Sequence, residues 1–237
     1  MKLSVLIPIH NEEATLQTIL QRVAEIENQA AIDSLEIVAV DDCSSDNSFE
    51  ILNNFAKHHK IEIIRHPVNL GKGAALRNAV AKASGDFTIF QDADLEYDPS
   101  DIVRMAEFAE SSSSAVVYGS RFLGKSTSPL GKAHYLVNRG LTLFSNLFTG
   151  LHLTDMETCY KMIRTDILKR IDLEENRFGI EPEITAKIAR LSKTEHFSVS
   201  EIPISYKPRK SADGKKIGLK DGFRALYVIL KYGIRFL

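Results

Sequence analysis

Several features that mark other protein classes are absent from this chain of 237 residues. It has no tryptophan and only two cysteines, Cys43 and Cys159, which form no CxxC pair, so the sequence offers no zinc framework and suits a reducing compartment. Its 30 basic and 31 acidic residues nearly balance, so the overall charge predicts no nucleic-acid partner. From the two unpaired cysteines we expect a cytoplasmic location.

Long apolar runs are also absent. The longest apolar stretches, such as residues 225–230, are far shorter than the roughly 20 residues that a membrane-crossing helix needs. Residues 1–9 pass from Met1-Lys2 straight into a strand-like segment and lack the apolar region and cleavage site of a signal peptide. We therefore expect a chain that does not span a membrane but can lie peripherally on its cytoplasmic face.

Short segments rich in valine and isoleucine alternate with helical patterns. The expected strands are residues 3–9, 35–40, 61–64, 87–90, 115–118, 159–163 and 199–206. This alternation predicts an α/β fold with a mostly parallel central sheet flanked by helices. Residues 219–237 carry apolar side chains at helical spacing with basic residues among them, which predicts a C-terminal amphipathic helix.

Polar residues follow the expected strands, at the sheet edge where ligands bind in open parallel sheets. Asp92 and Asp94 follow the fourth strand. Two carboxylates so close repel each other unless a cation lies between them, and their hard oxygen atoms suit Mg²⁺ or Mn²⁺. The alternative is a turn in which one aspartate caps a helix.

Two further segments suggest a nucleotide site. Asp41 and Asp42 follow the second strand, where a carboxylate can accept a hydrogen bond from a nucleobase or can cap a turn. Lys72 lies between Gly71 and Gly73, just before an expected helix. Glycines let the backbone approach a ligand, and the lysine and helix N-terminus favour phosphate, although a plain tight turn fits equally well.

Five segments, taken together, resemble the family 2 glycosyltransferases of the GT-A fold, and most closely the polyprenyl-phosphate (dolichol-phosphate) hexose synthase branch. In chain order they are Ile7-Pro8-Ile9-His10-Asn11-Glu12, Val40-Asp41-Asp42-x-Ser44, Asn69-x-Gly71-Lys72-Gly73, Asp92-Ala93-Asp94-Leu95 and Gly119-Ser120-Arg121. Residues 154–161, 177–181 and 201–209 continue the resemblance, which covers nearly the whole chain. The family usually has tyrosine where this chain has His10.

The resemblance implies a Rossmann-like GT-A domain and a role for particular residues. The nucleotide-sugar donor, a UDP- or GDP-hexose, would be bound by Pro8, His10, Glu12, Asp41, Asp42, Lys72, Asp92 and Arg209. The metal, Mg²⁺ or Mn²⁺, would be bound by Asp92, Asp94 and Gln91. The acceptor phosphate would be bound by Arg121 and Arg139. Residues 1–121 would form the nucleotide-sugar and metal-binding half of one continuous domain, and residues 122–237 the acceptor-binding half.

The implied reaction is the inverting transfer of a hexose to a polyprenyl phosphate. An ionised phosphate is its own nucleophile, so no protein base is needed, and Asp94, Arg121 and Arg209 would be the catalytic residues. A sugar hydroxyl is the alternative acceptor. It would need a base, and Asp155 or Glu157 would supply one.

Two other functions compete with this interpretation. Residues 119–126 match the phosphate-loop pattern GxxxxGK[ST] of nucleotide triphosphatases, but Pro129 and Gly131 follow where a true phosphate loop runs into a helix. A non-catalytic sugar-nucleotide binding module would keep the nucleoside pocket and need no metal. The sequence leaves a homo-oligomer open.

Overall fold

The fold is built around one mixed sheet. The computed structural model describes residues 1–124, 131–209 and 219–233. Its strands are β1 (Lys2–Ile9), β2 (Ser34–Asp41), β3 (Ile61–Arg65), β4 (Phe87–Phe90), β5 (Val116–Ser120), β6 (Lys161–Arg164) and β7 (Val199–Pro203). In this part of the chain seven strands pair in the order β3-β2-β1-β4-β6-β5-β7.

Most neighbouring strands are parallel, as the alternating pattern predicted. β1 pairs in parallel with β2 and β4, β2 with β3, and β5 with β7, whereas β6 runs antiparallel between β4 and β5. Leu3, Val5, Leu6 and Ile7 of β1 are fully buried, because helices cover both faces of the sheet. The predicted α/β fold with a mostly parallel sheet is therefore confirmed.

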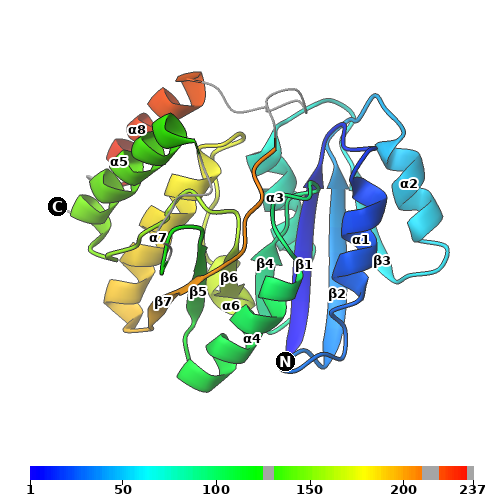
Figure 1. The fold of residues 1–237 in the computed structure, drawn as a ribbon, viewed down its shortest axis with the longest axis horizontal. Coiled ribbons are helices and arrows are strands. Elements are labelled where there is room, and N and C mark those ends of the chain that lie inside the picture. Colours follow the sequence, from blue (N-terminus) through cyan, green and yellow to red (C-terminus); the bar gives the residue numbers. More distant parts are fainter. Residues whose placement is uncertain (125–130, 210–218, 234–237) are drawn as a thin grey trace.

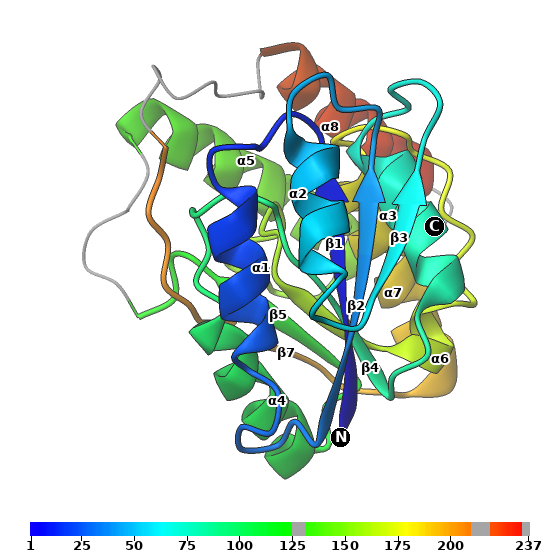
Figure 2. The same cartoon turned by 90° about the vertical axis from the view of Figure 1, so that its right-hand side faces the viewer.

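Helices pack on both faces of this sheet. They are α1 (Leu16–Ala24), α2 (Ser48–Phe55), α3 (Lys72–Lys82), α4 (Ser100–Ser112), α5 (Lys132–Thr149), α6 (Thr165–Leu168), α7 (Ile180–Glu195) and α8 (Leu219–Gly233). Figure 2 shows α1 and α4 over one face and α3 and α7 over the other. The apolar positions of α1, Leu16, Ile19, Leu20 and Val23, are fully buried, as their spacing predicted.

Helices α5 and α8 pack side by side beyond the edge of the sheet that carries β7 (Figure 1). Leu141 and Met156 pack with Ala225 and Ile229 of α8 in a small apolar cluster of their own. The predicted C-terminal helix is thus present, and the residues after position 233 lie outside the described part. None of the helices that the structure describes is long and apolar enough to cross a membrane.

The outer surfaces of α5 and α8 are strongly apolar. The exposed large side chains here are Leu136, Val137, Leu143 and Leu147 of α5 and Phe223, Leu226, Tyr227 and Leu230 of α8. We call these eight residues the apolar face. Scattered apolar side chains on a surface are ordinary, but eight large exposed ones on two helices that pack together are an unusual number for one region of a surface.

Candidate active site

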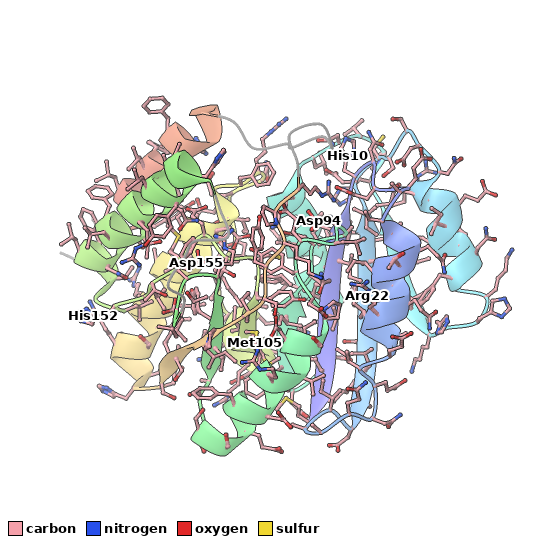
Figure 3. All side chains as sticks on the ribbon, viewed as in Figure 1. His10, Arg22, Asp94, Met105, His152 and Asp155 are labelled. Atoms are coloured by element: carbon pink, nitrogen blue, oxygen red, sulfur yellow. The ribbon has the colours of Figure 1, made fainter. Side chains whose placement is uncertain are left out.

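A cavity of about 830 Å³ lies beyond the carboxyl ends of β1, β2 and β4. Its lining includes the predicted site residues Pro8, His10, Glu12, Asp42, Lys72, Asp92, Asp94, Arg121, Glu157 and Arg209. Figure 3 shows His10 and Asp94 beyond the ends of the strands, and Asp155 on the side of α5. The expectation that ligands bind beyond the carboxyl ends of parallel strands therefore identified the position of the cavity.

Two protein cations lie against the aspartates that follow β4. Lys72 Nζ is 2.8 Å from Asp92 Oδ1, and Arg209 Nη2 is 3.2 Å from Asp94 Oδ2. Arg209 Nη2 also donates to Glu12 Oε2 at 2.6 Å. Glu12 and Arg209, which are 197 positions apart in the chain, thus contact each other beside Asp94.

Burial and mutual repulsion determine the charge of the two aspartates. Burial, and then the Asp92 carboxylate, raise the pKa of Asp94 to about 7, although Arg209 opposes the change. Burial is the largest influence on Asp92 and disfavours its charged form, but the Lys72 ammonium, the Cys159 thiol and Arg209 together lower the pKa of Asp92 below its usual value. A divalent cation beside both carboxylates would hold both of them ionised.

The donor set suits a metal that is completed by substrate oxygens. Within residues 1–124, 131–209 and 219–233, no three histidine, cysteine, aspartate or glutamate side chains form a group that could hold a metal ion alone. Asp92 and Asp94 supply two hard oxygen donors, and Mg²⁺ keeps open positions for phosphate oxygens. The acidic pair therefore fits a metal that is shared with a diphosphate.

Gln91, predicted as a third metal ligand, does not line the cavity. It is fully buried, its Oε1 accepts a hydrogen bond from the Tyr160 hydroxyl at 2.6 Å, and its Nε2 donates to the Asp92 carbonyl at 2.9 Å. The structure gives this residue a role in fixing the end of β4, and the prediction of Gln91 as a ligand is not supported.

Asp42 lines the cavity with both carboxylate oxygens already bound. Its Oδ1 accepts from the Leu70 N–H at 2.8 Å, and its Oδ2 accepts from the Gly71 N–H at 2.7 Å. His66 Nδ1 lies 2.6 Å from Oδ1, and His66 Nε2 lies 2.8 Å from Asn78 Nδ2. Asp42 thus fixes the loop that leads into α3, and the sequence pattern did not point to His66.

Asp41 lies outside the cavity, in contrast to Asp42. Its side chain is fully buried, and Arg65 Nε lies 3.2 Å from its Oδ2. His10 lines the cavity and is oriented by the Asp42 carbonyl oxygen, 2.9 Å from its Nδ1. The structure therefore places His10 and Asp42, but not Asp41, where a nucleoside could contact them.

Protein packing alone requires glycine on both sides of Lys72. A Cβ atom at Gly73 would clash with the carbonyl oxygen of Glu175, and one at Gly71 would clash with that of Asn176. Gly71 also has φ of +95°, which strains any residue with a side chain. Since the Ala74 N–H donates to the Asn176 carbonyl at 3.2 Å, this end of α3 is capped by protein.

Arg121 and Asp155 form a buried, two-pronged ion pair. Arg121 Nε and Nη2 donate to the two oxygens of Asp155, each at 2.7 Å. Asp155 is fully buried and does not line the cavity, so the prediction that it acts as a base is not supported. Arg121 does line the cavity, and its guanidinium orientation is fixed by this pair.

Of the two predicted bases, Asp155 and Glu157, it is Glu157 that lines the cavity. Its Oε1 is buried and has no hydrogen-bond partner among the described residues. Burial, and then the Glu181 carboxylate, raise the pKa of Glu157 to about 7, while Lys161 and Arg121 oppose the change. A carboxyl group with this pKa can hold or release a proton near neutral pH.

Arg139 lies apart from the cavity. It is exposed on α5, and its Nη1 donates to the Thr154 carbonyl at 2.8 Å. It is not among the lining residues, so the structure does not bring it together with Arg121. The structure therefore describes Arg139 as a charge on the helix surface, and the prediction that it binds the acceptor phosphate is not supported.

Glu181 lines the cavity and Lys161 lies buried behind it, although the sequence assigned neither of them a role. Glu181 Oε1 lies 3.1 Å from Lys72 Nζ, and Glu181 also pairs with the fully buried Lys161. Burial opposes the charge on Lys72, but Asp92 and Glu181 raise its pKa well above the usual value. Residues 177–181 share the resemblance to the glycosyltransferase family, and this resemblance could have identified Glu181 as a site residue.

The phosphate-loop alternative is not supported by the segment after β5. The Phe122 and Leu123 N–H groups donate to Ser120 Oγ at 3.1 and 3.0 Å, so they do not form a cradle for phosphate. Residues 121–124 are not helical, and the next helix described is α5. Residues 125–130 lie outside the described part.

The comparisons with known proteins agree on one family. The family model described as Glycosyl transferase family 2 matches residues 4–172. The chain is 26% identical over 237 residues to a dolichol-phosphate mannosyltransferase of Pyrococcus furiosus, covering 98% of this chain and 64% of that protein. It is 30% identical over 223 residues to an undecaprenyl-phosphate 4-deoxy-4-formamido-L-arabinose transferase of Proteus mirabilis, covering 92% of this chain and 64% of that protein. The chain thus spans less than two thirds of the length of these two relatives.

A solved structure shares the fold. Glucosyl-3-phosphoglycerate synthase from Mycobacterium tuberculosis, in complex with Mn²⁺, uridine diphosphate and glucosyl-3-phosphoglycerate, superposes with a TM-score of 0.71 at 16% identity. The match covers 98% of this chain and 80% of that one. At this identity the similarity concerns the fold alone, and it agrees with the GT-A architecture that the sequence predicted.

Proposed function

Because this chain belongs to glycosyl transferase family 2, we propose that it moves a hexose from a UDP- or GDP-sugar to a polyprenyl phosphate, with inversion at the anomeric carbon. The names of the relatives, which specify dolichol-phosphate and undecaprenyl-phosphate sugar transfer, support the lipid acceptor. The donor nucleotide and the sugar stay open between these alternatives.

One observation carries the proposal: a single cavity contacts both the acidic pair and two helices with apolar surfaces. At one side it is lined by Asp92 and Asp94 with their paired cations. At the other side it is lined by Val137 and Leu141 of α5 and by Ala225 of α8. A polar donor and the first units of an apolar lipid therefore fit into the same space.

The chain's own residues account for binding and charge stabilisation. Arg209 and Lys72 lie where a departing diphosphate would develop charge, and the planar guanidinium of Arg209 can contact two oxygens at once. Arg121, held by Asp155, presents a fixed cation to the acceptor phosphate. An ionised phosphate oxygen attacks the anomeric carbon without a protein base.

We propose that Asp92 and Asp94 hold Mg²⁺ or Mn²⁺ together with the donor diphosphate. When bound, this metal supplies positive charge to the leaving diphosphate. The structural relative that contains Mn²⁺ and uridine diphosphate supports the choice of ion. Without the metal, Asp94 is partly protonated near neutral pH, so a bound cation would stabilise its ionised form.

The lipid acceptor also accounts for the apolar face of α5 and α8. We propose that this face rests on the cytoplasmic surface of a membrane, with its apolar side chains at the boundary of headgroups and acyl chains. Leu147 and Phe223 are 76% and 73% exposed, which is a large apolar exposure for one surface of a water-facing domain. The acceptor would then enter the cavity between the two helices.

Glu157 supports a second candidate function, transfer to a sugar hydroxyl. Its buried Oε1 has no hydrogen-bond partner in the described chain, it faces the cavity, and its pKa of about 7 suits a general base. This alternative would no longer involve Asp155. It requires the carboxylate of Glu157 for transfer, whereas the phosphate acceptor does not.

The test is to incubate the protein with Mg²⁺ or Mn²⁺, a panel of labelled UDP- and GDP-sugars, and polyprenyl phosphate in vesicles. Donor-dependent label in the lipid, lost when the metal is chelated, is the expected result. Nucleotide binding without any transfer would favour a non-catalytic binding module. Transfer to a soluble sugar but not to the lipid would favour the hydroxyl acceptor.

A further inference from the structure

We propose that Glu175 is a positioning residue that couples helix α8 to the Lys72 end of helix α3, and so links the apolar wall of the cavity to its acidic pair. The kinetic meaning of this coupling rests on the proposed function. The contacts themselves do not depend on it. Glu175 lies just before α7, is 4% exposed, and has no part in the mechanism above.

The side chain of Glu175 binds helix α8. Arg224 donates to Glu175 Oε2 from Nη2 at 2.6 Å and from Nε at 3.1 Å. Lys231 Nζ lies 3.3 Å from Glu175 Oε1, and the Tyr232 hydroxyl lies 3.4 Å from the same oxygen. Lys231 also contacts Glu174 at 3.3 Å. One buried carboxylate thus accepts four hydrogen bonds from three side chains of α8.

The backbone around Glu175 contacts helix α3. The Glu175 carbonyl oxygen is the atom that leaves no room for a Cβ at Gly73, so the two segments touch directly. The Ala74 N–H donates to the next carbonyl, that of Asn176, at 3.2 Å. Arg77 of α3 adds contacts to Asn176 Oδ1 at 2.8 Å and to the Leu173 carbonyl at 3.2 Å.

The two helices that this segment joins carry different parts of the cavity. Gly222 and Ala225 of α8 line it, on either side of Arg224. Lys72 begins α3 and holds Asp92 at 2.8 Å. A shift of α8 would therefore act on Glu175, and the contacts of residues 173–176 with α3 would pass it to the position of Lys72. An acceptor that moves α8 would in this way change the donor site.

The experiment compares amide hydrogen exchange of the full chain and of the variants Glu175→Gln and Arg224→Gln. Both variants remove charge from the α8 contact and leave the α3 contact chemically intact. The matched control is Arg170→Gln. Arg170 forms an arginine–glutamate pair with Glu195 on the surface, with distances of 2.7 and 2.9 Å, and neither residue lines the cavity.

We expect the Ala74 amide to exchange faster in both variants by about 2- to 30-fold, the range for coupled residues that are distant from a ligand. The control should leave that amide unchanged. The Michaelis constant for the donor should rise in both variants, while the control leaves it unchanged. Faster exchange confined to α8, with Ala74 unaffected, would overturn the coupling. Since exchange needs no donor or acceptor, this result is independent of whether transfer occurs.

Discussion

Glu157→Gln offers a quantitative test of the cavity's electrostatics, because burial keeps this carboxyl group protonated to unusually high pH. The pKa of Glu157 is raised from 4.5 to about 7 in the folded protein. Between these two values the folded state binds more protons than the unfolded state, so stability falls as pH rises. A shift of this size corresponds to about 3 kcal/mol, lost progressively from pH 4.5 and fully lost above pH 7.

Glutamine has nearly the same shape and no charge to bury. We expect the gain in unfolding free energy of Glu157→Gln over the natural chain to be larger at pH 8 than at pH 5 by about 2 to 3 kcal/mol. Urea unfolding at both pH values, without added metal, measures this gain. Other titrating groups are common to both proteins and cancel to first order.

The exposed Glu107 of α4 provides the control, since Glu107→Gln should change stability by no more than about 0.5 kcal/mol at either pH. A gain for Glu157→Gln that is the same at pH 5 and pH 8 would refute the reasoning. The same variant separates the two acceptors. It keeps lipid-phosphate transfer, whereas a hydroxyl acceptor that needs this base would lose about 100- to 10,000-fold in rate.

Three further outcomes follow from other contacts. Asp94→Asn should lower transfer by at least about 100-fold and abolish metal-dependent nucleotide binding, as measured by calorimetry. Leu147→Asn should weaken binding to anionic vesicles in a sedimentation assay and leave nucleotide affinity unchanged. Gly73→Ala should lower the free energy of unfolding by about 1 to 3 kcal/mol, because its Cβ meets backbone atoms of Glu175. Gly140→Ala, where nothing lies within 4 Å, should raise it in the same urea titration by about 0.5 to 1 kcal/mol.

The central strands could be predicted because they are buried on both faces. A strand such as β1 has to be apolar almost throughout, and turns with polar residues mark its ends. The position of β6 could not be predicted in the same way. It pairs Arg164 with Phe87 and Ile163 with Val116, and local periodicity carries no information about partners so far apart in the chain.

Two residues that the motifs predicted to bind ligands do not line the cavity. Asp41 and Asp42 are neighbours, and so are Gln91 and Asp92, and they lie at or just after the ends of β2 and β4. In both pairs the second residue lines the cavity and the first is buried beneath it. The motif marks the correct strand end, but it does not say which neighbour faces the ligand.

The sequence also could not show which charges are paired in the tertiary structure. Asp155 and Glu157 are two residues apart and looked equivalent as bases. In the structure Asp155 is satisfied by Arg121, whereas a buried oxygen of Glu157 has no hydrogen bond within the described residues. Burial makes the ionised forms of Glu157 and Asp94 unfavourable when no ligand is bound. Apolar residues would be more stable at both positions, so we expect these two acids to serve function and not stability.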